Sequence, residues 1–228
     1  MKTEILLCLF TYSAFFALSW KSHKGGYLKL FNEFGGFTTR PFQLIGNHLA
    51  GVIVLGVLPL VLFKKDVAAL LESDASGNAN TILMGMIFFS LLIFTAIWQG
   101  KKVGERIKNI ETHEITLTVK PLVAYFVARF LFLIAYEFWF RGLLLFYCVN
   151  WLGVVPALVV NLVLYVLVHV FSGTKEMLAC VPFGLLVCFF SLAFHSFWPA
   201  VLFHVGFSFA YEGALLRSLL RNFKIQLS

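Results

Sequence analysis

The chain has 228 residues, of which 60% are hydrophobic and 13% are charged, and its mean hydropathy is +0.89. This composition excludes a soluble domain, because the water-facing surface of such a domain needs a larger share of charged residues. The net charge of +7 comes from short clusters of Lys and Arg between apolar runs, where these residues orient membrane helices, so no nucleic-acid partner is expected. The sequence therefore predicts an all-α, polytopic membrane protein embedded in a lipid bilayer.

Apolar segments of membrane-spanning length follow one another along the whole chain. A hydrocarbon core of about 30 Å requires roughly 20 apolar residues in each helix. On this measure there are about seven transmembrane segments, near 4–20, 43–63, 81–99, 121–151, 154–171, 177–194 and 197–216. The first segment resembles a signal peptide in length, but no clear small-residue cleavage site follows it, so we interpret it as a retained span.

The fourth segment, 121–151, is too long for one straight crossing. It predicts either two helices or one long helix that bends or leaves the membrane near Arg141 and Gly142. The choice affects the orientation of every later segment.

Three stretches between or after the spans are rich in Lys and Arg: 21–40, 100–120 and 217–228. Cytoplasmic loops are enriched in these residues, and all three stretches share one side if 121–151 crosses once. We therefore expect the N-terminus outside and the C-terminus in the cytoplasm, in the plasma (inner) membrane of a prokaryote. The 64–80 loop would face outward.

The chain shows no internal repeat and no soluble appendage, so its function must reside in the helices. We divide it into N-terminal transmembrane segments with basic loops (1–120), a functional membrane core (121–216) and a basic cytoplasmic tail (217–228).

Ionisable side chains at membrane depth are expensive and therefore indicate a functional site unless a partner explains them. Most of them lie in the C-terminal half, in three pairs spaced four residues apart, so that each pair shares one helical face. The pairs are Glu137 with Arg141, Tyr165 with His169, and His204 with Ser208. A carboxylate and two imidazoles converging from three helices could activate a water molecule or bind a metal ion such as zinc.

Each feature also has a purely structural interpretation. Glu137 and Arg141 could form an ion pair that holds a bent helix, and either His169 or His204 could be a hydrogen-bonded packing residue. His195 precedes a segment boundary and is expected at the membrane interface. Glu212 follows His204 by eight residues and belongs either to the rim of the site or to the solvated surface.

The order of the motifs resembles the CPBP family of intramembrane proteases, also called the CAAX prenyl endopeptidase or Abi family. The family pattern is EExxxR, then FxxxH, then His followed four residues later by Asn or a similar small polar residue. The matching stretches here are "YEFWFRG", "YVLVH" and "HVGFS", and the resemblance covers roughly residues 121–210.

The resemblance implies a role for each matching residue. Glu137 and His169 would activate water, Arg141 would hold Glu137, and His204 with Ser208 would support the oxyanion. Tyr165 replaces the Phe of the second motif, and Ser208 stands where Asn is usual.

Tyr136 is the main departure, because it occupies the position of the first motif glutamate, which is the residue usually assigned as general base. Neighbouring helix positions point about 100° apart, so Glu137 cannot take that place without a rotation or bend of the helix. A tyrosine is a poor base at neutral pH.

We therefore expect an intramembrane endopeptidase that cleaves a membrane-associated protein or peptide. The alternatives are a catalytically inactive protein of the same fold, which binds a partner in a membrane-protein complex or confers immunity, and a small transporter subunit. No cofactor is expected. If the reaction depends on a metal, the ligands would be Glu137, His169 and His204 around zinc.

Overall fold

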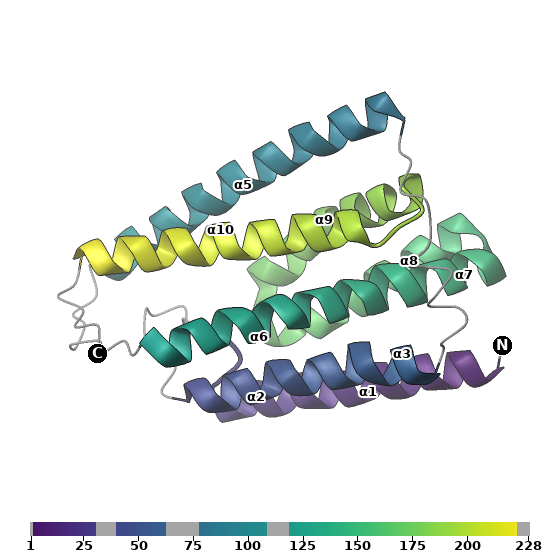
Figure 1. Cartoon of the computed structure of the whole chain (residues 1–228), viewed down its shortest axis with the longest axis horizontal. Helices are drawn as coiled ribbons and strands as arrows, with labels where there is room; N and C mark the ends of the chain where they lie inside the picture. Colours follow the sequence, from purple (N-terminus) through teal and green to yellow (C-terminus); the bar gives the residue numbers. More distant parts are fainter. Residues whose placement is uncertain (1, 31–39, 63–77, 109–118, 223–228) are drawn as a thin grey trace.

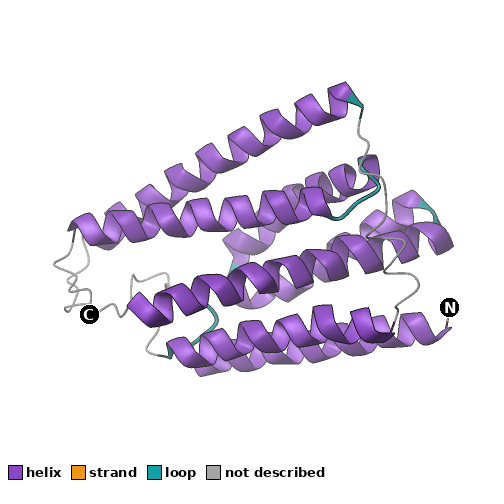
Figure 2. Cartoon of the chain, in the orientation of Figure 1, coloured by secondary structure: helices purple, strands orange, loops and turns teal. Residues whose placement is uncertain are grey.

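The computed structural model describes residues 2–30, 40–62, 78–108 and 119–222, and all regular structure in these ranges is helical (Figure 2). Its elements are α1 (Lys2–Gly25), α2 (Pro41–Val52), η1 (Ile53–Val57), α3 (Leu58–Leu62), α5 (Ala79–Lys108), α6 (Val119–Glu137), η2 (Phe138–Leu144), α7 (Leu145–Leu152), α8 (Val154–Val168), η3 (His169–Ser172), α9 (Thr174–Ala193) and α10 (Trp198–Asn222). The expected all-α fold is confirmed.

Among the described residues, six helices are long and apolar enough to cross a membrane, which confirms an integral, multi-pass membrane protein. They run Pro41–Leu62, Ala79–Arg106, Lys120–Leu152, Val154–Ser172, Thr174–Ala193 and Trp198–Arg221. Each overlaps one of the predicted segments after the first. The first predicted segment, 4–20, lies in helix α1, which is not among the six.

Helix α1 nevertheless packs into the bundle. The Trp139 indole Nε1 donates a hydrogen bond of 2.9 Å to Thr11 Oγ1 on α1, and the Tyr12 hydroxyl donates one of 3.0 Å to the Leu164 carbonyl. These bonds join α1 to the helices that follow residue 119.

The helix directions bring the basic ends of the bundle together (Figure 1). Helices α1, α5 and α10 run one way, while α2 to α3 and α6 to α7 run the other way. The ends of α1, α5 and α10 lie at the same end of the bundle as the start of α6, as the single crossing of 121–151 requires. The predicted outward loop 64–80 falls almost wholly outside the described residues, as do positions 223–228 of the predicted tail.

The fourth predicted segment is one continuous helix with a change of helical type at its centre. Helix α6 ends at Glu137, the π-helix η2 occupies Phe138–Leu144, and α7 continues to Leu152. The predicted interruption at Arg141 and Gly142 therefore corresponds to a π-helix, a form that occurs mostly as a short insertion within α-helices and frequently at functional sites.

Helix α5 packs along α10, and small residues allow this close approach. A Cβ atom added at Gly100 would lie 3.0 Å from the Ala214 Cβ and nearer still to the Tyr211 carbonyl oxygen. Small residues at such contacts are typical of membrane helix pairs. Since α5 belongs to the predicted N-terminal part and α10 to the predicted core, the two parts are closely packed.

Candidate active site

Glu137 and Arg141 form an ion pair at the junction of α6 and η2. Both side chains are completely buried, and the Arg141 Nη1 lies 3.0 Å from Glu137 Oε2. This distance makes the two groups an ion pair, but these two atoms do not form a hydrogen bond. The Arg141 guanidinium carbon also lies 4.1 Å from the centre of the Tyr165 ring, a cation–π contact. The predicted pairing of Glu137 with Arg141 is thus present.

Asn161 on α8 supports the π-helix that carries Arg141. Its Nδ2 donates a 2.6 Å hydrogen bond to the Phe140 carbonyl, and its Oδ1 accepts a 3.3 Å bond from the Cys188 thiol. Asn161 was not predicted as a site residue, although a lone amide in the apolar run "ALVVNLVLY" was the available signal.

His204 is the second partner of Glu137. Its Nδ1 donates a hydrogen bond to Glu137 Oε1, so the two carboxylate oxygens serve different partners, Arg141 and His204. The His204 side chain is 13% exposed. Because a neutral imidazole that donates from Nδ1 has its lone pair on Nε2, His204 can accept a proton there.

His169 lies on the other side of the site, where α8 gives way to the short 3₁₀ turn η3. Its Nδ1 donates a 2.8 Å hydrogen bond to the Tyr165 carbonyl, which leaves Nε2 as the acceptor. In the described part of the chain no hydrogen bond joins His169 to Glu137, the two residues that the motifs pair for water activation.

Tyr136 lies between the two histidines. The centre of its ring is 5.8 Å from that of His204 and 6.4 Å from that of His169, with both imidazoles nearly perpendicular to it. It is 2% exposed, and the ring of Tyr165 lies 6.0 Å away. The predicted departure from the family pattern therefore occupies the centre of the site.

Ser208 belongs to a different group of polar residues. Its hydroxyl accepts a long, 3.5 Å hydrogen bond from Arg129 Nη2, and the Arg129 Nε lies 3.0 Å from Glu212 Oε1. The Tyr125 hydroxyl donates to the same Glu212 oxygen over 3.1 Å, and His48 Nε2 faces Arg129 Nη1 at 3.3 Å.

This second polar cluster joins α2, α6 and α10. Glu212 is 8% exposed, so it is a buried ion-pair partner and neither a rim residue nor a solvated one. Arg129 was not predicted as a site residue, although an arginine within the apolar run "YFVARFLFL" was a usable signal.

His195 lies apart from both groups. It is exposed in the turn between α9 and α10, with a left-handed backbone at φ 48°. Its expected position at a segment boundary agrees with this turn.

The described residues do not bring three metal ligands together. No group of three or more His, Cys, Asp or Glu side chains in these ranges could hold a metal ion, and the alternative set of Glu137, His169 and His204 reduces to the Glu137–His204 pair. The arrangement therefore does not fit a zinc site.

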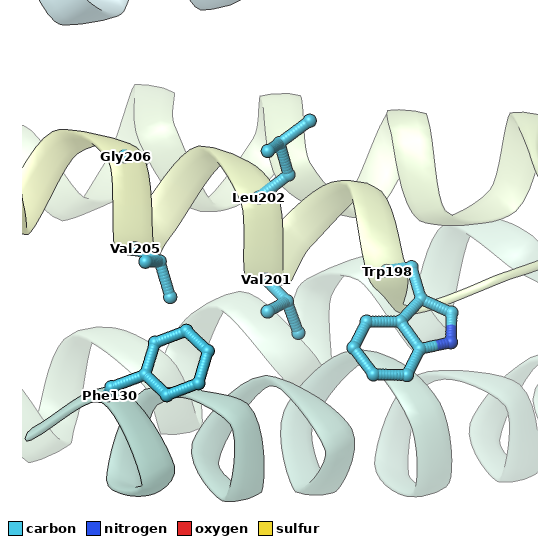
Figure 3. A pocket seen from close by; sticks show the side chains of 6 residues that line it. All are labelled: Phe130, Trp198, Val201, Leu202, Val205 and Gly206. Atoms are coloured by element: carbon cyan, nitrogen blue, oxygen red, sulfur yellow. The ribbon is translucent and has the colours of Figure 1, made fainter. Parts of the chain in front are cut away.

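An apolar hollow opens between α6 and α10 (Figure 3). Its volume is about 270 Å³, and it is lined by Phe130, Trp198, Val201, Leu202, Val205 and Gly206. In Figure 3 Val201 and Val205 point from α10 toward the helix that carries Phe130. Trp198, Leu202 and Phe130 are each more than 40% exposed, so the hollow faces the surroundings of the bundle.

Comparison with known proteins finds a family match over the part of the chain that carries this site. Residues 118–210 match the family model described as Type II CAAX prenyl endopeptidase Rce1-like, a stretch that contains Tyr136, Glu137, Arg141 and both histidines. A search of curated proteins and a search of solved structures found no match. Residues 118–210 are therefore similar to the CPBP family of CAAX prenyl endopeptidase-like membrane proteins.

Proposed function

We propose that the chain is an intramembrane endopeptidase that hydrolyses a peptide bond of a membrane-associated protein or peptide. The observation that carries this proposal is the hydrogen bond from His204 Nδ1 to Glu137, whose other carboxylate oxygen faces Arg141. A carboxylate that fixes the tautomer and orientation of an imidazole is the arrangement by which many hydrolases prepare a general base.

His204 is the general base in this proposal. Its Nε2 takes a proton from a water molecule as the water oxygen attacks the carbonyl carbon of the scissile bond, and it later returns that proton to the leaving amine. Glu137 stabilises the imidazolium that forms between these two steps. Arg141 balances the charge of Glu137 when the imidazole is neutral.

His169 has a supporting role. Its Nδ1 is held by the Tyr165 carbonyl, so the lone pair on Nε2 can accept a hydrogen bond from the attacking water and orient it. These roles differ from those that the family resemblance implies, because Glu137 is bonded to His204 and Ser208 to Arg129.

The apolar hollow supports a substrate that arrives from the membrane. Val205 lines it and directly follows His204 in the chain, so the hollow lies on the same helix as the general base. The hollow offers no charged side chain to a soluble, polar peptide.

The mechanism uses no metal ion. We therefore expect a strong chelator to leave the hydrolysis rate unchanged in the purified protein. Loss of activity in chelator that added zinc restores would contradict this expectation.

A second candidate is a binding protein that keeps the fold without the chemistry. The observation that favours it is Tyr136, which occupies the place of the family glutamate between the two histidines. If this candidate is correct, the wild-type protein is inactive and Tyr136→Glu introduces activity.

Substitution of the three proposed residues tests the first candidate, with a fluorogenic membrane-anchored peptide and purified protein. Removing a general base or its orienting carboxylate typically lowers kcat about 10²–10⁴-fold, so we expect losses of this size for His204→Ala and Glu137→Gln, and a smaller loss for His169→Ala. His195→Ala is the matched control, because that imidazole lies in an exposed turn. Full activity in all three site variants would refute the proposal.

A further inference from the structure

The hydroxyl group of Tyr136 is a buried polar atom without a hydrogen-bond partner among the described residues. The Tyr136 side chain is 2% exposed, and aromatic rings surround its ring. The distance from the centre of the Tyr136 ring is 4.6 Å to the centre of the Phe140 ring, 5.6 Å to that of Phe132 and 5.9 Å to that of Phe15. A phenyl ring would pack equally well among these rings, and none of them gives the Tyr136 hydroxyl a hydrogen-bond partner.

An unpartnered buried hydroxyl destabilises a protein, because the group has lost its hydrogen bonds to water and gained none. Phenylalanine would fill the same space without that cost. The hydroxyl group therefore requires an explanation other than packing, and the contact of the Tyr136 ring with both imidazole rings supplies one.

We propose that Tyr136 is a catalytic residue whose hydroxyl donates a hydrogen bond to the carbonyl oxygen of the scissile peptide bond. This inference rests on the proposed endopeptidase function. Tyrosine is a neutral O–H donor at neutral pH, which is the property that an oxyanion site requires. The residue at the family's glutamate position thus acts as a donor in this chain, while His204 is the base.

The donor acts in both steps of hydrolysis. In the first step, the water oxygen bonds to the carbonyl carbon, His204 Nε2 takes one water proton, and the carbonyl π electrons move to the oxygen, which Tyr136 stabilises. In the second step, the C=O bond forms again, the C–N bond breaks, and the amine takes the proton from His204. Tyr136 keeps its proton throughout, so no further reactant is needed.

Tyr136→Phe tests the role of the hydroxyl group, because it removes only one oxygen atom. Loss of an oxyanion donor lowers kcat about 10²–10³-fold, and we expect this loss with KM within a few-fold of wild type. The melting temperature should stay the same or rise, since the unpartnered group is gone. Tyr125→Phe is the matched control, a second buried tyrosine whose hydroxyl donates to Glu212 in the second polar cluster, and it should keep kcat within a few-fold.

Inhibitor binding provides a second measurement that does not depend on how much of the sample is folded. A peptide trifluoromethyl ketone forms a hydrate that imitates the tetrahedral intermediate. Tyr136→Phe should weaken this inhibitor by about the same factor as kcat/KM, because both report transition-state binding, while the affinity for the uncleaved peptide changes little.

The outcomes separate this inference from the proposed function. An active wild type whose Tyr136→Phe variant keeps full kcat, or keeps the ratio of inhibitor affinity to peptide affinity, overturns the donor role and leaves the endopeptidase standing. An inactive wild type overturns both, whether or not Tyr136→Glu is active. An active wild type with the selective loss of kcat and inhibitor affinity supports both.

Discussion

At the scale of single residues, the site depends on the way in which Glu137 divides its two oxygens. One faces the cation of Arg141 and the other accepts the hydrogen bond of His204. A fully buried carboxylate is tolerated only when such partners compensate for lost hydration. The pair thus combines a structural role with the orientation of an imidazole.

Arg141→Leu should destabilise the protein by about 3–5 kcal/mol, because it leaves the buried charge of Glu137 without its cation. Adding Glu137→Gln to this variant should recover much of the loss, since the uncompensated charge is then removed. Denaturation in detergent with helicity as the signal measures both variants. A single variant as stable as wild type, or a double variant no better than the single one, would contradict the ion-pair account.

Ser208→Ala should lower kcat by less than about threefold. The Ser208 hydroxyl bonds to Arg129 over 3.5 Å, and the donation to the oxyanion that the family motif implies would itself be worth about 10²–10³-fold in kcat. Initial rates at saturating substrate decide between the two roles. A hundredfold loss of kcat would show that the Ser208 hydroxyl donates to the oxyanion.

At the scale of secondary-structure elements, the π-helix η2 determines how Arg141 is presented. In η2 the Leu145 amide donates to the Phe140 carbonyl, five residues back, and Asn161 donates to the same oxygen. The Asn161 side chain therefore connects α8 to the helix that carries the ion pair.

Asn161→Leu should destabilise the protein by about 1–3 kcal/mol, because it leaves the Cys188 thiol without its acceptor and removes one donor to the buried Phe140 carbonyl. The catalytic rate should fall with it, since η2 loses its support. Ser90→Ala is the matched control: its hydroxyl donates to the Met86 carbonyl on an exposed face and should contribute little. Equal melting temperatures for the two variants would argue against this connection.

At the scale of the whole molecule, the sequence was sufficient for the elements and insufficient for their contacts. Apolar run lengths predicted each of the six spanning helices, and four-residue spacing predicted the pairing of Glu137 with Arg141. The partner of Glu137 across the bundle is 67 positions away, at His204, and nothing in local spacing distinguishes it from His169. The cluster around Arg129 was missed for the same reason, because its members come from three helices.

Membrane orientation is a prediction at this scale. The ends of α1, α5 and α10 lie at one end of the bundle and carry Lys21, Lys24, Lys101, Lys102, Arg106, Arg217 and Arg221. By the positive-inside rule we expect this end in the cytoplasm. A fluorescent protein fused after Ser228 should therefore fluoresce, while alkaline phosphatase at the same place should be inactive. The reverse result would show that this end of the bundle faces away from the cytoplasm.

The central claim is that Glu137 and His204 activate water to hydrolyse a peptide bond, and isotope incorporation tests it most directly. Purified protein and a membrane-anchored peptide are incubated in water enriched in ¹⁸O, and the products are analysed by mass spectrometry. We predict one ¹⁸O atom in the new carboxyl group with wild type and at least about a hundredfold less product with His204→Ala. No cleavage by wild type, or equal cleavage by the variant, would contradict the account.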